Sequence, residues 1–147
     1  MKKILVAGIG NIFFGDDAFG CEVVKALENN VLPNSVKLID FGIKTRDLAY
    51  ELCENYEKII LIDAIKTGNK AGTISLIKLN SQDFIKPNFN ISHEARIEEA
   101  LSFSMILRAK IGEIYLVGCE IESMEELSET VKKSIVKAVE IVKNLIK

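Results

Sequence analysis

The stretch GIGNIFFGDDAFG, residues 8–20, joins a glycine-rich turn to two adjacent acids, Asp16 and Asp17. A glycine-rich turn between a strand and a helix is typical of a phosphate-binding loop. Acids at the phosphate position oppose that use, because at about 4 Å and an effective dielectric near 20 each carboxylate repels a phosphate charge by about 4 kcal/mol. The dipole of one helix terminus stabilises a phosphate by several times less free energy than this. The loop therefore favours a cation over a bare phosphate.

Two further acids come at the ends of apolar runs. Asp40 closes the run VKLID, and Asp63 closes the run KIILID. In open α/β sheets, ligands bind beyond the carboxyl ends of the strands. We therefore expect Asp16, Asp17, Asp40 and Asp63 to meet at one edge of a sheet.

The chain has a single histidine, His93. Ser92 suits the N-cap of a helix and would place His93 in the first turn, where the neutral imidazole that binds metals is favoured. A lone histidine is, however, more often a surface or capping residue. Asp16 or Asp17 is expected to cap the first helix, as Thr45 caps the second. The agreement of the acids and His93 on one edge predicts a site that engages a metal ion.

A dinucleotide site is the main alternative reading of the same loop. Gly8 and Gly10 would make the tight turn, and Asp40 would hold a ribose hydroxyl. The fingerprint G-x-G-x-x-G requires its third glycine at position 13, but Phe13 stands there and the next glycine is Gly15. The loop also has no Walker A lysine, so the nucleotide reading is incomplete.

The elements that must position these residues are read from the apolar pattern. Runs rich in isoleucine, valine and leucine predict strands at residues 3–8, 36–40, 58–63, 73–79 and 113–118. Apolar residues at helical spacing lie between most of them and follow the last. Continuous apolar runs indicate strands that are buried on both faces, which predicts a three-layer α/β/α sandwich. The link KTGNKAG, residues 66–72, is too short for a parallel crossover, so we expect the fourth strand to be antiparallel.

Composition narrows the classes of function. A length of 147 residues fits one domain over residues 1–147. The 19 basic residues are interspersed among 21 acids, which argues against a nucleic-acid partner. No apolar run approaches a membrane span, and the N-terminus has no cleavage site. Cys21, Cys53 and Cys119 lack any C-x-x-C spacing, which favours a reduced, cytoplasmic setting and packing roles over a thiol protease.

The motif G-I-G-N-I-x-x-x-D-D-x-x-G, followed by Asp63 in LIDAI and by ISHE at residues 91–94, resembles the [NiFe]-hydrogenase maturation endopeptidases. The resemblance spans essentially the whole chain. It implies a mixed five-stranded sheet of the phosphorylase/hydrolase-like type, with one antiparallel strand. It also implies a cytoplasmic protease that removes the C-terminal extension of a nickel-loaded hydrogenase large-subunit precursor.

The resemblance also assigns roles to residues. It makes Asp17, Asp63 and His93 the metal ligands and the catalytic residues, and it assigns Asp40, Gly42 and Asp16 to substrate recognition.

Two departures from the family pattern bear on these assignments. Asp17 stands where many relatives have the longer glutamate. Many relatives carry D-G-G-T after the second strand, whereas this chain has D-F-G-I-K-T-R, residues 40–46, which resembles the variants acting on deazaflavin-cofactor-reducing hydrogenases.

The implied mechanism uses nickel that the precursor itself supplies, and no nucleotide. The acids repel one another without the ion and attract it when it is present, so cleavage would depend on correct nickel loading. The ion could polarise the scissile carbonyl or activate a water molecule. A Rossmann-like nucleotide-binding protein and a non-catalytic nickel-binding maturation factor stay open as alternatives. Phe13, Phe14 and Phe41 mark either a docking surface or core, and we expect core for at least one of them.

Overall fold

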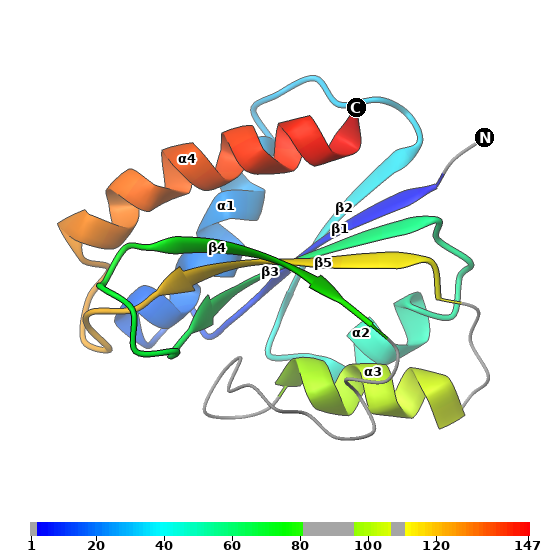
Figure 1. Ribbon diagram of the computed structural model, residues 1–147, viewed down its shortest axis with the longest axis horizontal. Helices are drawn as coiled ribbons and strands as arrows, with labels where there is room; N and C mark the ends of the chain where they lie inside the picture. Colours follow the sequence, from blue (N-terminus) through cyan, green and yellow to red (C-terminus); the bar gives the residue numbers. More distant parts are fainter. Residues whose placement is uncertain (1–2, 81–95, 107–110) are drawn as a thin grey trace.

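A mixed sheet with the strand order β2-β1-β3-β5-β4 forms the centre of the molecule (Figure 1). The computed structural model describes residues 3–80, 96–106 and 111–147, and this part of the chain contains five strands. They are β1 (Ile4–Ile9), β2 (Val36–Gly42), β3 (Lys58–Ile65), β4 (Ile74–Leu79) and β5 (Glu113–Glu120). Neighbouring strands pair in parallel except β4, which is antiparallel to β5. The predicted mixed sheet with an antiparallel fourth strand is confirmed.

Helices cover both faces of the sheet. On one face lie α1 (Phe19–Leu27) and α4 (Glu129–Ile146), and on the other lie α2 (Thr45–Glu51) and α3 (Arg96–Ile106) (Figure 1). Each helix pair encloses its own apolar core cluster against the sheet. The predicted three-layer α/β/α sandwich is therefore confirmed.

The central strand β3 shows why the apolar runs are continuous. Ile59 and Leu61 belong to the core cluster beneath α2 and α3, whereas Ile60 and Ile62 belong to the cluster beneath α1 and α4. Successive side chains of a strand point to opposite faces, and both faces here are covered by helices. Burying each such side chain stabilises the fold by about 1.5–3 kcal/mol.

The carboxyl ends of the parallel strands meet at one edge, on the left in Figure 1. We expected Asp40 and Asp63 to end their strands, but β2 and β3 each continue for two residues beyond these acids. Each acid lies beside a glycine of the neighbouring strand, Asp40 beside Gly8 and Asp63 beside Gly118. A glycine leaves room for the acid, and the backbone ladder continues past it.

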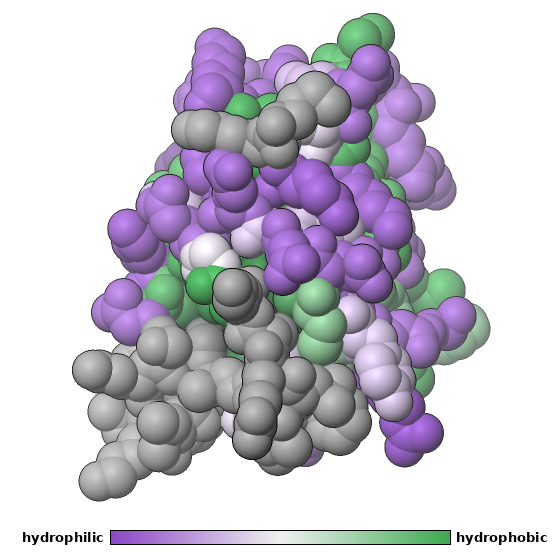
Figure 2. Space-filling view, turned by 90° about the vertical axis from the view of Figure 1, so that its right-hand side faces the viewer, coloured by the Kyte–Doolittle hydropathy of each residue, from purple (hydrophilic) through white to green (hydrophobic). Residues whose placement is uncertain are grey.

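The opposite end of the sheet has a different surface. Figure 2 shows this end, where the parallel strands begin, and hydrophilic residues cover most of the described part of the face. In the segments that the structure describes, no helix is both long enough and apolar enough to cross a membrane.

Candidate active site at the carboxyl edge of the sheet

Asp17 lies in η1 (Gly15–Ala18), a short 3-10 helix between β1 and α1. Its side chain is 1% exposed, and its Oδ2 accepts a hydrogen bond of 3.1 Å from the backbone N–H of Asn11. The Oδ1 of Asn11 in turn accepts from the N–H of Phe13 at 2.9 Å. The turn after β1 therefore wraps around Asp17. The motif contained a signal for this role of Asn11, because asparagine favours such turns.

Neither acid of the pair caps the first helix, so that prediction is wrong. The N-cap of α1 is Ala18, and it has no side-chain cap. At the start of α1 a backbone carbonyl takes the place of a side-chain cap, since the N–H of Phe19 donates to the carbonyl of Asp16. Thr45 likewise begins α2 rather than capping it. Carboxylates that are not used as caps remain for other partners.

Asp63 and Asp40 approach the same edge from neighbouring strands. Asp63 is 0% exposed in the centre of the sheet, and its Oδ1 accepts a hydrogen bond of 2.8 Å from the N–H of Ala64. Asp40 is exposed, and its Oδ1 accepts from the N–H of Gly42 at 3.0 Å. One acid is thus buried within the sheet, and the other faces solvent at its rim.

The side chain of Cys21 shows that these acids converge. It is buried on α1, and its Sγ donates a hydrogen bond of 3.5 Å to the carbonyl of Gly10. Burial raises the pKa of the Cys21 thiol, and the carboxylates of Asp40, Asp63 and Asp17 raise it further. The negative charges of three elements, η1, β2 and β3, therefore act on one thiol.

The negative charge near Cys21 decides which residues at this edge can take part in chemistry. A thiolate beside three carboxylates is strongly disfavoured, so Cys21 is unsuited to act as a nucleophile near neutral pH. Burial also raises the pKa of Cys119, to about 11. The carboxylates themselves suit cation binding and proton transfer. The sequence predicted only a packing role for Cys21, and its position beside the acids was missed.

The expected third metal ligand is His93. His93 and the neighbouring Ser92 lie outside the described residues. Within residues 3–80, 96–106 and 111–147, no three His, Cys, Asp or Glu side chains form a group that could hold a metal ion. Asp17 and Asp63 alone would leave an ion short of protein ligands, so a complete site requires a ligand from elsewhere.

An apolar pocket of about 270 Å³ adjoins the acids. It is formed by the turn after β1 and the end of β2, and it is lined by residues 10–13 and 40–44. Around it Ile12, Phe13 and Ile43 are exposed, Phe13 by 82%. Phe41, in contrast, packs in the core, which confirms the expectation for at least one of the three phenylalanines.

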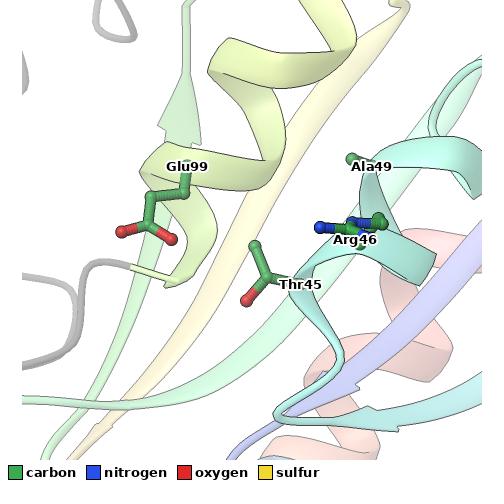
Figure 3. Close-up of a pocket in the computed structure, with 4 residues that line it drawn as sticks. All are labelled: Thr45, Arg46, Ala49 and Glu99. Atoms are coloured by element: carbon green, nitrogen blue, oxygen red, sulfur yellow. The ribbon is translucent and has the colours of Figure 1, made fainter.

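A second pocket, of about 280 Å³, opens between α2 and α3 (Figure 3). The described residues that line it are Thr45, Arg46 and Ala49 of α2 and Glu99 of α3. Arg46 and Glu99 are both exposed and give the two helices opposite charges across the opening. None of the acids at the carboxyl edge is among these residues.

The glycines of the first motif serve close packing. A Cβ on Gly20 would come within 2.2 Å of the carbonyl oxygen of Ile62 and 2.3 Å of that of Ile9. Helix α1 therefore lies directly on the backbones of β1 and β3, and this contact brings Cys21 to the acids. Packing of this kind accounts for Gly20 without a phosphate.

Comparisons with known proteins support the family resemblance that the motifs indicated. The family model described as hydrogenase maturation protease matches residues 21–145. A Methanocaldococcus jannaschii protein assigned to the hydrogenase maturation proteases is 37% identical, over 99% of this chain and 97% of its own. Subunit delta of the coenzyme F420 hydrogenase of Methanothermobacter thermautotrophicus is 30% identical, over 95% of this chain and 92% of its own.

Solved structures agree as well. The hydrogenase maturating endopeptidase HybD from Escherichia coli superposes with a TM-score of 0.83 at 29% identity, covering 97% of this chain and 91% of that one. The resemblance read from the motifs is thereby confirmed. The chain belongs to the hydrogenase maturation protease family and is an endopeptidase that cleaves the precursor of a hydrogenase large subunit.

Proposed function

We propose that this endopeptidase cleaves only after nickel has been inserted, because the nickel carried by the [NiFe]-hydrogenase precursor is the feature that it recognises. In this proposal Asp17, Asp63 and His93 approach the ion. The supporting observation is that Asp17, Asp40 and Asp63 lie at the carboxyl edge of the sheet, in η1 and near the ends of β2 and β3. Like charges brought together at one edge repel one another, and a divalent cation converts that repulsion into attraction. A precursor without nickel would lack this attraction.

The proposal accounts for an incomplete metal site in the described residues. An ion that arrives with the substrate brings ligands from the precursor, so the protease needs to add only a few. Asp17 and Asp63 are carboxylates on rigid elements, which suits such a role. Holding the ion in the transition state more tightly than in the ground state would accelerate cleavage.

The chemistry that we propose is hydrolysis of one peptide bond. A water molecule attacks the scissile carbonyl carbon, and a carboxylate at the edge accepts the proton of that water. The proton then passes to the leaving nitrogen as the C–N bond breaks. The substrate's nickel can assist by polarising the carbonyl or by activating the water.

For substrate recognition, we propose Asp40, Gly42 and the adjoining apolar pocket. Asp40 and Gly42 line this pocket, and it lies next to the acids that would act on the peptide bond. Exposed apolar residues such as Phe13 at its rim suit the docking of a folded protein. The expected role of Asp16 in substrate recognition is not part of this proposal, because that side chain is fully buried.

The identity of the client is a narrower proposal. Residues 40–46 read D-F-G-I-K-T-R, and this segment borders the pocket. A relative that is 30% identical is named as a subunit of a coenzyme F420 hydrogenase. We propose a deazaflavin-reducing hydrogenase as the client, processed in the cytoplasm by a single domain that spans residues 1–147.

The test uses a nickel-loaded precursor and variants of single carboxylates. Asp63→Asn should abolish release of the C-terminal peptide, measured by mass spectrometry, because an amide keeps the shape but loses the charge. Glu140→Gln is the matched control, since Glu140 is an exposed carboxylate on α4. Unchanged cleavage by Asp63→Asn would refute the role of this acid. Nickel binding without any cleavage would instead favour a non-catalytic maturation factor.

A further inference from the structure

We infer that Asp16 is a positioning residue for the cleavage reaction, because it fastens η1 to the loop at residues 121–128 that follows β5. This inference rests on the proposed function, in which the neighbouring Asp17 approaches the substrate's nickel. It replaces both sequence-based expectations for Asp16, the helix cap and the contact with substrate.

Among the described residues, the hydrogen bonds of the Asp16 side chain all lead to this one loop. Its side chain is 0% exposed. The Oδ2 atom accepts from the N–H groups of Glu122 and Ser123, each at 2.8 Å, and from the hydroxyl of Ser128 at 2.9 Å. The Oδ1 atom accepts from the N–H of Ser128 at 2.7 Å. The N–H of Asp16 donates in return to the carbonyl of Ser123 at 2.8 Å.

The same contacts join η1 to the start of α4. Ser128 is the N-cap of α4, and its Oγ accepts from the N–H of Val131 at 3.3 Å. One hydroxyl therefore caps α4 and donates to Asp16. Two elements that are more than a hundred residues apart in sequence meet through a single carboxylate.

The backbone beside Asp16 fits the loop just as closely. Gly15 has a φ of +53°, and a Cβ there would lie 2.7 Å from the carbonyl oxygen of Ser123 and 2.8 Å from the N–H nitrogen of Glu126. Any side chain at this position would separate η1 from the loop. The loop and η1 lie together at the left end of the molecule in Figure 1.

This anchoring bears on the reaction because Asp16 and Asp17 are adjacent in the chain. A short 3-10 helix has few internal hydrogen bonds to fix its place. With Asp16 held by the loop and Asp17 held by Asn11, the second carboxylate has a defined position. Catalytic groups must be held to within about 0.5 Å of their productive geometry, and a displacement of about 1 Å costs roughly 100-fold in rate.

The first variant is Asp16→Asn. The amide oxygen can replace only one carboxylate oxygen, and the NH₂ group then faces an N–H or hydroxyl donor that it has no means to satisfy. We expect kcat for a nickel-loaded precursor to fall by about 10- to 100-fold, while KM changes by less than about 3-fold because the docking pocket is intact. Wild-type kcat for a folded Asp16→Asn protein would overturn the inference.

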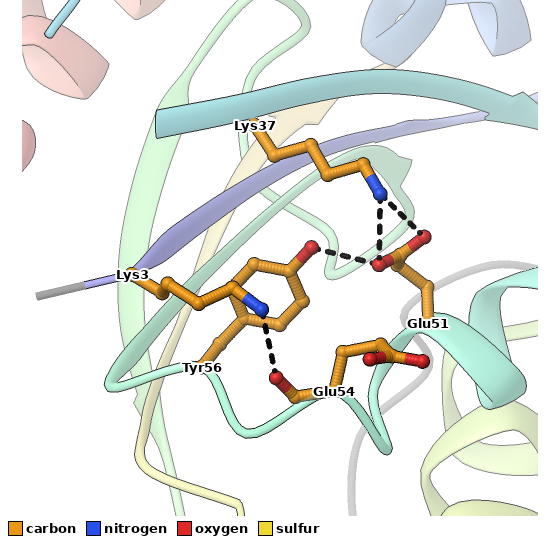
Figure 4. Close-up of polar contacts among 5 residues, drawn as sticks. All are labelled: Lys3, Lys37, Glu51, Glu54 and Tyr56. Carbon is orange, nitrogen blue, oxygen red and sulfur yellow. Dashed lines mark hydrogen bonds and ion pairs between the residues drawn. The ribbon is translucent and has the colours of Figure 1, made fainter. Parts of the chain in front are cut away.

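The matched control lies at the other end of the sheet. The hydroxyl of Tyr56 donates to Glu51 at 2.7 Å, in a polar cluster with Lys3, Lys37 and Glu54 (Figure 4). Tyr56→Phe removes a buried hydrogen bond there without touching the carboxyl edge. We expect it to lower the melting temperature and leave kcat unchanged. A loss of kcat in Tyr56→Phe as large as that in Asp16→Asn would show that general destabilisation is the cause.

A milder pair of variants keeps the test valid if Asp16→Asn does not fold. Ser128→Ala removes one of the four hydrogen bonds to the carboxylate, and Ser128→Thr retains the hydroxyl. We expect Ser128→Ala to lose about 3- to 10-fold in kcat and Ser128→Thr to regain most of it. Equal kcat in both would contradict the inference. Failure of the proposed function looks different, since wild-type protein would then cleave nickel-free precursor whatever the Asp16 and Ser128 variants do.

Discussion

Substitution Gly20→Ala tests whether α1 must lie directly on the sheet. The added methyl carbon would be 2.2 Å from the carbonyl oxygen of Ile62, against the 3.4 Å at which ordinary contact begins, so about 1.2 Å of movement is required (3.4 − 2.2). Overpacking of this kind costs about 1–3 kcal/mol. Both blocking oxygens, those of Ile62 and Ile9, belong to the backbones of central strands, so we expect a value near the upper end.

Part of this cost is offset, because alanine is favoured over glycine in a helix by up to about 1 kcal/mol. The net loss of about 2 kcal/mol should lower the melting temperature by about 4–8 °C for a domain of this size. Urea unfolding gives the free energy, and precursor cleavage should slow because α1 follows directly on η1, so its displacement also moves Asp17. The paired control is Gly118→Ala, whose Cβ has three side-chain atoms of Ile65 as its nearest neighbours and should cost less. An unfolding free energy for Gly20→Ala equal to that of the wild type would refute the packing argument.

Three further predictions concern the thiols and the exposed rim. Raising the pH from 9 to 11 should reduce the free energy of unfolding by about 2 kcal/mol through Cys119, because burial raises the pKa of its thiol from 9.0 to about 11, so the unfolded chain ionises first. Urea titrations should show a shallower dependence for Cys119→Ala, and an unchanged slope would contradict this. Iodoacetamide should modify the partly exposed Cys53 before Cys21 and Cys119, as read by peptide mass spectrometry, and equal rates would count against the described burial. Phe13→Ser should raise KM for the precursor by about 10-fold, a loss of about 1.4 kcal/mol, with the unfolding free energy unchanged to within about 0.5 kcal/mol. An unchanged KM would exclude Phe13 from the docking surface.

The layers and the antiparallel fourth strand follow from patterns that are local in the sequence. The unbroken apolar run of β3 indicated a strand covered on both faces, and the short link at residues 66–72 indicated the antiparallel β4. The rule for strand ends predicted Asp16, Asp17, Asp40 and Asp63 at one edge. Each of these inferences needs only the residues near the feature that it predicts.

The parts that failed depend on contacts between distant segments. Asp16 was expected to cap the nearest helix, but its partners lie in the loop at residues 121–128, which no local rule connects to it. Phe41 and Phe13 look alike in the sequence, yet one packs in the core and the other faces solvent. The prediction for His93 lies outside the described residues and stays a prediction.

The most direct measurement of the central claim compares two forms of one substrate. The wild-type protein is incubated with a hydrogenase large-subunit precursor that carries nickel and, separately, with the same precursor without nickel, and mass spectrometry follows release of the C-terminal peptide. The account predicts release from the nickel-loaded precursor alone, because only the ion turns the repulsion among Asp17, Asp40 and Asp63 into attraction. Equal release from the nickel-free precursor would contradict it.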